Sequence, residues 1–333
     1  MKKITILIYL YCAFVSTEIL AQTFFGNEPL AHTFSIVARD PQTGEMGVAV
    51  QSHWFSVGSL VAWGEAGVGV VATQSFVNPS FGQRGLELLK TGKTAQEVVD
   101  ELIASDEGRD VRQLAIVDSK GNSASYTGSK CIDAAGNIAG NGYSVQANMM
   151  LNNTVWGAMS KAFENSKGPL AERLITALEA AQKEGGDIRG KQSACLLVVK
   201  GEASGNLWED RLIDLRVEDN PQPIDEIKRL LKLYRAYEHM NNGDLATEKG
   251  DMKLAMDEYN AAMKMFPENL EMKYWTAISL ANTGEVEKSL PKFKEIFAAD
   301  VNWKELTKRL PDASPFTTSR QADCLPRISP PSF

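Results

Sequence analysis

The residues best suited to chemistry in this 333-residue chain are polar side chains at the ends of otherwise apolar, strand-like runs. They are Ser52, Gln74, Asn78, Gln146 and Asn148. Hydroxyl and amide groups so placed stabilise the negative oxygen that develops when a carbonyl is attacked. Gln74 and Asn148 are the strongest candidates, because an amide without a partner is costly in an apolar strand. Each of the five also fits ordinary hydrogen bonding.

Other kinds of site receive little support. The run GVGVVA, Gly67–Ala72, has the glycine spacing of a phosphate loop, but it leads into a strand instead of opening a helix. His53 lies next to Ser52, yet no G-x-S-x-G motif accompanies them, which disfavours a Ser-His-Asp triad. The three histidines form no cluster with metal-ligand spacing. We therefore expect no metal and no other cofactor.

The N-terminal residues indicate the cellular compartment of the protein. Lys2 and Lys3 precede the apolar run Ile4–Val15, and Ala21 suits the position before a cleavage site. This pattern is typical of a secretory signal peptide over residues 1–21, and the apolar run is shorter than the ~20 residues of a membrane span. We expect an exported protein, periplasmic or extracellular, that starts at Gln22 and has no membrane span after cleavage.

The net charge and the cysteine content argue against two further classes, nucleic-acid-binding proteins and disulfide-stabilised proteins. Loss of the signal removes two positive charges and one negative, which takes the net charge from −7 to about −8 and argues against a nucleic-acid partner. Outside the signal, Cys131, Cys195 and Cys324 form an odd, widely spaced set, so no disulfide scaffold is indicated. Cys195 lies in an apolar run and is expected to be a small buried hydrophobe.

The elements that must position these side chains alternate between strand pairs and helix pairs. Alternation and turn residues predict a hairpin of Thr33–Ala38 with Met46–Ser52 and a second of Leu60–Trp63 with Val68–Ser75. The later strands and the helices are expected at Gln113–Val117, Ser123–Thr127, several short runs up to Asn148, Cys195–Val199 and Arg211–Val217, and at Gln83–Leu89, Thr94–Leu102, Val155–Glu164 and Leu170–Lys183. This order favours antiparallel sheets layered with helices over a parallel βαβ series.

The region from Thr33 to about Asn220 resembles a bacterial family called domain of unknown function 1028. The resemblance is carried in order by HTFSIVARDPQTGEMGVAVQSHWFSVGS, GKTAQEVVDELIASD, RQLAIVDSKGNSASYTGSKC, GNGYSVQANMM and LAERLITALEAAQKEGGDIRGKQSACLLVV. That family is thought to resemble the N-terminal-nucleophile hydrolases. The resemblance therefore implies an α+β fold, a four-layer αββα sandwich, over residues 33–220.

The resemblance also implies a role for Thr33. In N-terminal-nucleophile hydrolases the first residue of the first strand attacks an amide carbonyl, and its freed α-amino group, with a pKa near ~7.7, accepts the hydroxyl proton. Signal cleavage leaves Gln22 at the terminus, so Thr33 has a free amine only if the His32–Thr33 bond is also cut. Residues 22–32 are then either a linker or a pro-segment. The other interpretation of Thr33 is a β-branched residue that opens a strand.

The C-terminal part follows a different pattern. Gly250, Ala255 and Tyr259 recur as Gly284, Ser289 and Phe293, each 34 residues later, and GDMKLAMDEYNAAMKMFPEN has the spacing of a tetratricopeptide repeat. This predicts an all-α helical domain over 221–310, with repeats at about 236–269 and 270–303, a lead-in helix 225–237 and a capping helix 302–310. Residues 311–333 are proline-rich and are expected to be a disordered tail.

Two functions follow. The first is an exported amidohydrolase that cleaves the C–N bond of an unknown amide substrate through Thr33. The alternative is a non-catalytic exported binding or scaffold protein whose repeats hold a peptide, protein or cell-wall partner. The N-terminal residue of the mature protein separates the two.

Overall fold

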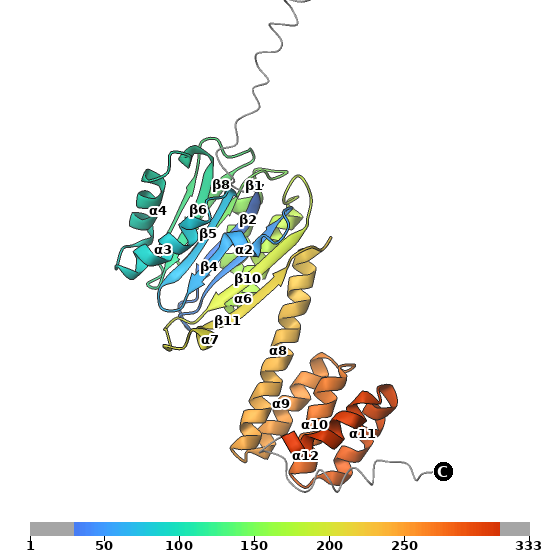
Figure 1. Ribbon diagram of the computed structural model, residues 1–333. Coiled ribbons are helices and arrows are strands. Elements are labelled where there is room, and N and C mark those ends of the chain that lie inside the picture. Colours follow the sequence, from blue (N-terminus) through green and yellow to red (C-terminus); the bar gives the residue numbers. More distant parts are fainter. Residues whose placement is uncertain (1–29, 314–333) are drawn as a thin grey trace, which may run out of the picture. The chain divides into compact units, whose positions relative to one another are not determined.

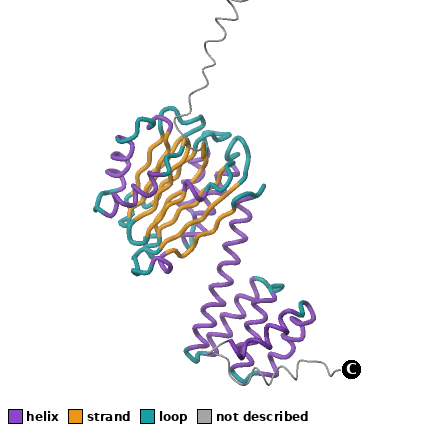
Figure 2. The backbone as a smooth tube through the Cα atoms, in the orientation of Figure 1, coloured by secondary structure: helices purple, strands orange, loops and turns teal. Residues whose placement is uncertain are grey.

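The computed structural model describes residues 30–313. The predicted signal peptide, most of the segment 22–32 and most of the tail lie outside the described residues. The described chain divides between Ile227 and Lys228 into two compact units. The first contains two antiparallel sheets with their helices, and the second is entirely helical (Figures 1 and 2).

The larger sheet has six strands in the order β11–β10–β3–β2–β9–β8. Its two central strands, β2 (Thr33–Arg39) and β3 (Met46–Ser52), form the predicted first hairpin, in which Thr33 lies opposite Ser52. The other strands are β8 (Gly136–Gly140), β9 (Tyr143–Ala147), β10 (Ser193–Val199) and β11 (Arg211–Val217).

The second sheet has five strands. Its path is β1 (Leu30–Ala31), β5 (Gly69–Phe76), β6 (Arg112–Asp118) and β7 (Ser123–Thr127), and β4 (Ala62–Glu65) also pairs with β5. Because β6 takes one edge of β5, strands β1 and β4 share the other edge, at residues 75–76 and 69–72 respectively.

The helices cover the outer faces of the two sheets. Helices α3 (Ser80–Lys90) and α4 (Ala95–Ala104) pack on the five-stranded sheet (Figure 1). Helices α5 (Val155–Asn165) and α6 (Leu170–Lys183) pack on the six-stranded sheet. An apolar core fills most of the space between the sheets, where Val37 and Val48 meet Val70. The first unit is therefore a mixed α/β domain of two facing antiparallel sheets.

One predicted strand is partly wrong. Residues Gly58–Val61 form a short helical turn, α2, and β4 starts only at Ala62. In this turn Gly58 lies directly against Cys195, where a Cβ would come within 2.6 Å of the Cys195 Cβ, so only glycine fits there. Alternation of side chains in the sequence does not report such a close approach. A second short helix, α7 (Leu207–Asp210), precedes β11.

The described part of the second unit, up to Ala313, is built of helices. The lead-in segment and the first helix of the predicted repeats are one continuous helix, α8 (Pro223–Glu248). It is followed by α9 (Met252–Met265), α10 (Leu270–Asn282), α11 (Val286–Ala299) and α12 (Asn302–Ala313). Helix α12 continues past Pro311, where the sequence predicted the tail to begin.

Cys195 lies in the core between the sheets, as its apolar context predicted. Burial raises the pKa of its thiol to about 12, so the thiol remains protonated at neutral pH. It is therefore unsuited to be a nucleophile.

A test of the packing uses two helical glycines. A Cβ on Gly82 would lie 2.2 Å from the Trp63 ring, whereas a Cβ on Gly157 would meet nothing within 4 Å. Gly82→Ala should therefore lower the free energy of unfolding by about 1–3 kcal/mol through overpacking. Gly157→Ala should raise it by up to about 1 kcal/mol through helix propensity. Urea denaturation measures both, and equal effects of the two changes would contradict this packing.

Candidate active site

Thr33 lies where the chain crosses from one sheet to the other. Residues 30–31 pair with β5 of the five-stranded sheet, and Thr33 begins β2 in the six-stranded sheet. Ala31, His32 and Thr33 are all at most 1% exposed. The Thr33 Oγ1 donates to the Ala31 carbonyl at 2.7 Å. In the uncut chain the hydroxyl is thus buried and already hydrogen-bonded.

The His32 carbonyl, directly before Thr33, accepts two side-chain donors. Ser52 Oγ donates to it at 2.5 Å and Arg189 Nη2 at 2.9 Å. Asp187 is 2% exposed and binds the same guanidinium, with Nη2–Oδ2 at 2.7 Å and Nε–Oδ1 at 3.0 Å. Such a bidentate pair fixes the orientation of a guanidinium. The carbonyl carbon of the His32–Thr33 bond is therefore polarised by a hydroxyl and a fixed cation.

The Thr33 carbonyl is held by two of the predicted amides. Gln74 Nε2 donates to it at 3.1 Å, and the backbone N–H and the Nδ2 of Asn148 donate at 3.1 and 3.4 Å. Asn148 Oδ1 lies 2.7 Å from His32 Nδ1. The carbonyls of His32 and Thr33 are thus both held by side chains, which come from both sheets and from the loop that carries Arg189.

Gln113 connects these amides and was not predicted. Its Nε2 donates to the carbonyl of Ala147 at 2.9 Å and to Thr127 Oγ1 at 2.8 Å, so its Oε1 must face the opposite way. That oxygen accepts from Gln74 Nε2 at 2.6 Å and from Asn148 Nδ2 at 2.9 Å. Asn148 Oδ1 is then left for His32, whose Nδ1 must carry the proton.

Gln146 belongs to the same network one step further from Thr33. Its Nε2 donates to Ser35 Oγ at 2.5 Å, and Ser35 donates to Gln74 Oε1 at 2.6 Å. Asn78 does not join the network: its Oδ1 accepts from the N–H and Oγ of Ser80 at the start of α3. The structure therefore brings Ser52, Gln74, Gln146 and Asn148 together around Thr33, and places Asn78 in a local turn.

The side chains of this network that the sequence analysis missed are Ser35, Gln113, Asp187 and Arg189. Gln113 stands in the apolar strand RQLAIVD, so the reasoning that selected Gln74 could also have found it. Asp187 and Arg189 lie in the connection between α6 and β10, and no pattern in the sequence relates them to His32.

Two residues with left-handed backbone flank the network. Ser75, directly after Gln74, has φ = 74°, and Met149, directly after Asn148, has φ = 58°. A non-glycine residue in this region costs roughly 1–3 kcal/mol and persists only where its surroundings impose it. The strain lies next to the two amides that hold the Thr33 carbonyl.

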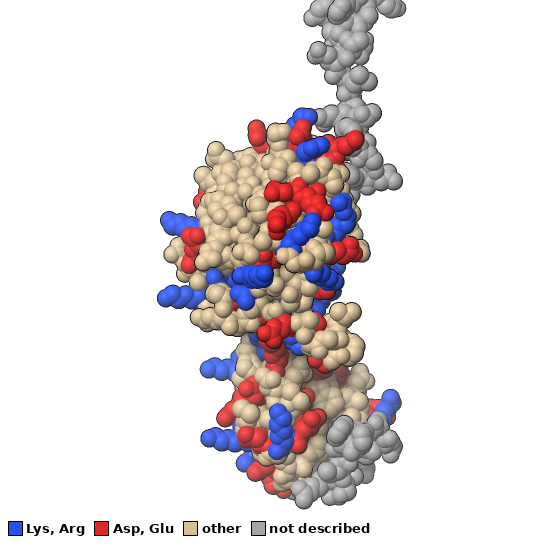
Figure 3. Space-filling model, turned by 90° about the vertical axis from the view of Figure 1, so that its left-hand side faces the viewer, with Lys and Arg blue, Asp and Glu red and all other residues tan. Residues whose placement is uncertain are grey.

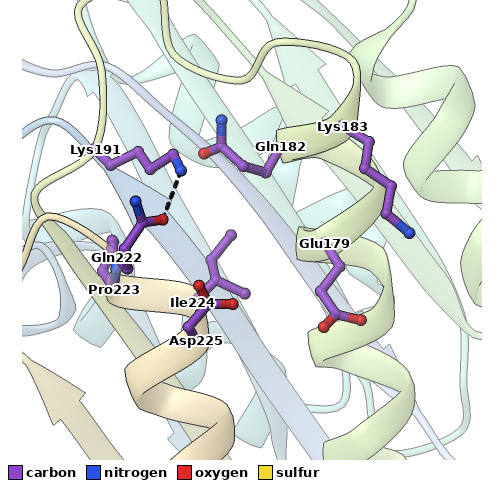
Figure 4. Close-up of a pocket in the computed structure, with 8 residues that line it drawn as sticks. All are labelled: Glu179, Gln182, Lys183, Lys191, Gln222, Pro223, Ile224 and Asp225. Atoms are coloured by element: carbon purple, nitrogen blue, oxygen red, sulfur yellow. Dashed lines mark hydrogen bonds between the residues drawn. The ribbon is translucent and has the colours of Figure 1, made fainter.

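The described surface hollows lie elsewhere. A hollow of about 1060 Å³ is lined by the turns at the other end of the strands, including residues 41–45. The seven residues of β2 put that end roughly 20 Å from Thr33. A pocket of about 220 Å³ lies between the end of α6 and the start of α8, where Lys191 turns toward Gln222 (Figure 4). Neither hollow includes a predicted site residue.

Among residues 30–313, no group of three or more His, Cys, Asp or Glu side chains could hold a metal ion. No helix in the same range is long and apolar enough to cross a bilayer. On the face drawn in Figure 3, the described basic and acidic side chains are interspersed.

Two facing antiparallel sheets with outer helices make the first unit a mixed α/β domain, and a helical region follows it. Comparison with known protein families shows the family to which the chain belongs. Residues 33–227 match a family of unknown function (DUF1028), and the chain belongs to that family. A crystal structure of protein SPO2555 from Silicibacter pomeroyi, of the same family, is 32% identical with a TM-score of 0.55. The match covers 61% of this chain and 88% of that one.

A second solved structure is more distant. Anbu (ancestral beta-subunit) from Yersinia bercovieri is 14% identical with a TM-score of 0.29, over 59% of this chain and 92% of that one. A likeness this low supports no argument about fold or function. Comparison with curated proteins gave no match.

The central position of Gln113 is testable. Gln113→Leu keeps the volume but leaves Gln74 and Asn148 without their shared acceptor, which should lower the free energy of unfolding by about 2–5 kcal/mol. The control is Gln192→Leu, at a residue near the surface that bonds Asp219, where the change should stay within about 0.5 kcal/mol. Similar small losses for both variants in denaturant titrations would show that the network contributes little.

His32 should make stability depend on pH. Burial lowers the pKa of its imidazole below the ordinary 6.5. The charge of Arg189 lowers this pKa further, whereas the Asn148 hydrogen bond and the Asp187 charge raise it by less. The unfolded state therefore takes up a proton that the folded state resists, so stability is full above pH 6.5 and falls as the pH drops below it. His32→Gln should flatten the curve of unfolding free energy between pH 7 and 5. Parallel curves for the two proteins would refute this assignment.

Proposed function

We propose that this protein is an exported amidohydrolase of the N-terminal-nucleophile type, in which Thr33 attacks an amide carbonyl after the His32–Thr33 bond is cut. The observation that carries the proposal is the pair of donors on the His32 carbonyl. Ser52 and Arg189 stand where negative charge would develop on a carbonyl oxygen beside the Thr33 hydroxyl.

Amide hydrolysis by this mechanism needs only Thr33, Ser52 and Arg189. Once freed, the α-amine of Thr33 has an ordinary pKa of about 7.7 and accepts the Oγ1 proton at neutral pH. The Oγ1 then forms a bond to the substrate carbonyl carbon, and the oxygen takes up negative charge opposite Ser52 and Arg189. The amine leaves with the proton, an ester on Thr33 remains, and water hydrolyses that ester to a carboxylate and the free hydroxyl.

The arrangement of layers supports assigning the first unit to the four-layer αββα sandwich of these hydrolases. Helix pairs lie outside two facing antiparallel sheets, and the candidate nucleophile opens a central strand of one of them. The signal-like sequence of residues 1–21 supports export.

The helical unit is proposed to be a pair of tetratricopeptide repeats. Close contact of small residues between helices is the basis of that pattern, and Gly243 meets it because a Cβ there would lie 2.5 Å from the Tyr259 ring. Ala255 and Ala262 are completely buried. The role that suits such helices is to hold a peptide or protein partner.

One observation favours the alternative function, a non-catalytic binding protein. In the uncut chain the Thr33 nitrogen is a peptide nitrogen, and Thr33 is completely buried, so neither base nor access exists. A chain that is never cut before Thr33 would retain only its binding surfaces.

Intact-mass and N-terminal sequence analysis of the exported protein test the proposal. We expect a chain that starts at Thr33. An acylating β-lactone should add its mass to that residue, because the hydroxyl and the α-amine act together. Thr33→Ser should retain labelling, and Thr33→Ala should lower its rate by about 10³-fold or more.

The control for this test is Thr43→Ala, in the β2–β3 turn at the far end of β2, which should label at the wild-type rate. A mature chain that starts at Gln22 and resists the lactone would exclude the enzymatic function.

A further inference from the structure

Residues 30–32 are held in the fold in the manner of a bound peptide. The backbone of β1 pairs antiparallel with the end of β5, Leu30 opposite Phe76 and Ala31 opposite Ser75. Addition of an extended strand to an open sheet edge is a general mode of peptide recognition. Departure of this segment would expose the edge of β5 next to Thr33.

The residue before Thr33 has a side-chain pocket of its own. The His32 imidazole is buried between the Phe76 ring, edge-on at 5.5 Å, and the Asn148 amide, which accepts from Nδ1 at 2.7 Å. Because the network fixes the Asn148 oxygen toward His32, the pocket prefers a flat side chain that donates a hydrogen bond.

The carbonyl of that residue is held by a cation. The Arg189 side chain is 28% exposed, whereas its partner Asp187 carboxylate is completely buried, so the guanidinium lies between solvent and the His32 carbonyl. A carboxylate in this place would gain a charge-assisted hydrogen bond.

We propose that the space of residues 30–32, once vacated, is the acyl-side substrate site, and that the substrate is an extended peptide with histidine or a similar flat donor before the cleaved bond. This rests on the proposed function. The peptide backbone adds to the β5 edge, its side chain bonds Asn148, and its scissile carbonyl faces Ser52 and Arg189. Hydrolysis breaks the C–N bond and leaves a peptide ending in a carboxylate, which the Arg189 cation retains.

The first experiment measures binding rather than turnover. The protein is the chain from Thr33 to Phe333, with the initiator methionine removed, and the probe is the tripeptide Leu-Ala-His with a free carboxylate in isothermal calorimetry. We expect binding, about tenfold weaker binding of both Leu-Ala-Leu and the C-terminal amide, and no binding to the uncut chain, whose own residues fill the site.

Two asparagine variants locate the side-chain pocket. Asn148→Ala should abolish the tenfold preference for histidine over leucine, and Asn78→Ala, outside the network, should keep it. Arg189→Gln should abolish the preference for the carboxylate over the amide. The proposal would be overturned if the chain from Thr33 to Phe333, without substitutions, bound Leu-Ala-His, Leu-Ala-Leu and the C-terminal amide with equal affinity.

A second experiment uses the full-length chain and does not depend on folding of the shortened one. His32→Gly empties the imidazole pocket, so added imidazole should raise the Tm of this variant. It should not do so for the wild type or for His32→Gly combined with Asn148→Ala. Absence of any specific rise would overturn the side-chain pocket.

The outcomes separate this inference from the proposed function. Lactone labelling of Thr33 without tripeptide binding would support the hydrolase function and exclude the proposed peptide site. Tripeptide binding without labelling would leave a peptide-binding site and remove the hydrolase.

Discussion

The hydrogen bonds of one buried glutamine determine the arrangement around Thr33. Backbone and hydroxyl acceptors fix the amide nitrogen of Gln113, its oxygen orients Gln74 and Asn148, and Asn148 sets the tautomer of His32. Every step has one direction, because an amide can donate only from its nitrogen. A buried polar group without a partner costs about 1–3 kcal/mol, so reversing one amide would penalise the whole chain of bonds. The network is therefore stable in a single arrangement.

This network also fixes how the two sheets face each other. Apolar side chains fill most of the space between them and contribute burial without direction. At the end of the sheets near Thr33 the facing side chains are polar, and Ser35 in β2 donates a directed hydrogen bond to Gln74 in β5. A slip of one residue in either strand would turn these side chains to the opposite face and leave them unpaired. Apolar burial supplies the bulk of the stability, and the polar end specifies the register at the point where the chain crosses between sheets.

Sequence patterns predicted the parts of this structure that depend on local rules. Strand alternation located β2, β3, β7 and β11, and the cost of an amide in an apolar strand identified Gln74 and Asn148. Arg189 was missed because its link to His32 spans 157 residues and comes from a loop without periodicity. The α2 turn was also missed, and the close approach of its Gly58 to Cys195 in β10 is a contact that alternation along the chain does not report. Local rules report which face a residue takes, and they do not report which distant residue meets it there.

The burial of Thr33 follows from the same contacts that would serve a substrate. The donors on the His32 carbonyl, the pocket around its imidazole and the open edge of β5 are all satisfied by the chain itself. Holding Ser75 and Met149 in left-handed backbone costs free energy that ordinary packing does not require. A purely structural role for residues 30–32 explains their burial. It does not require that a buried carboxylate, Asp187, fix the Arg189 cation against the His32 carbonyl, directly before the Thr33 hydroxyl. Arg189 and Asp187 are therefore the contacts on which the proposed chemistry at the His32–Thr33 bond rests.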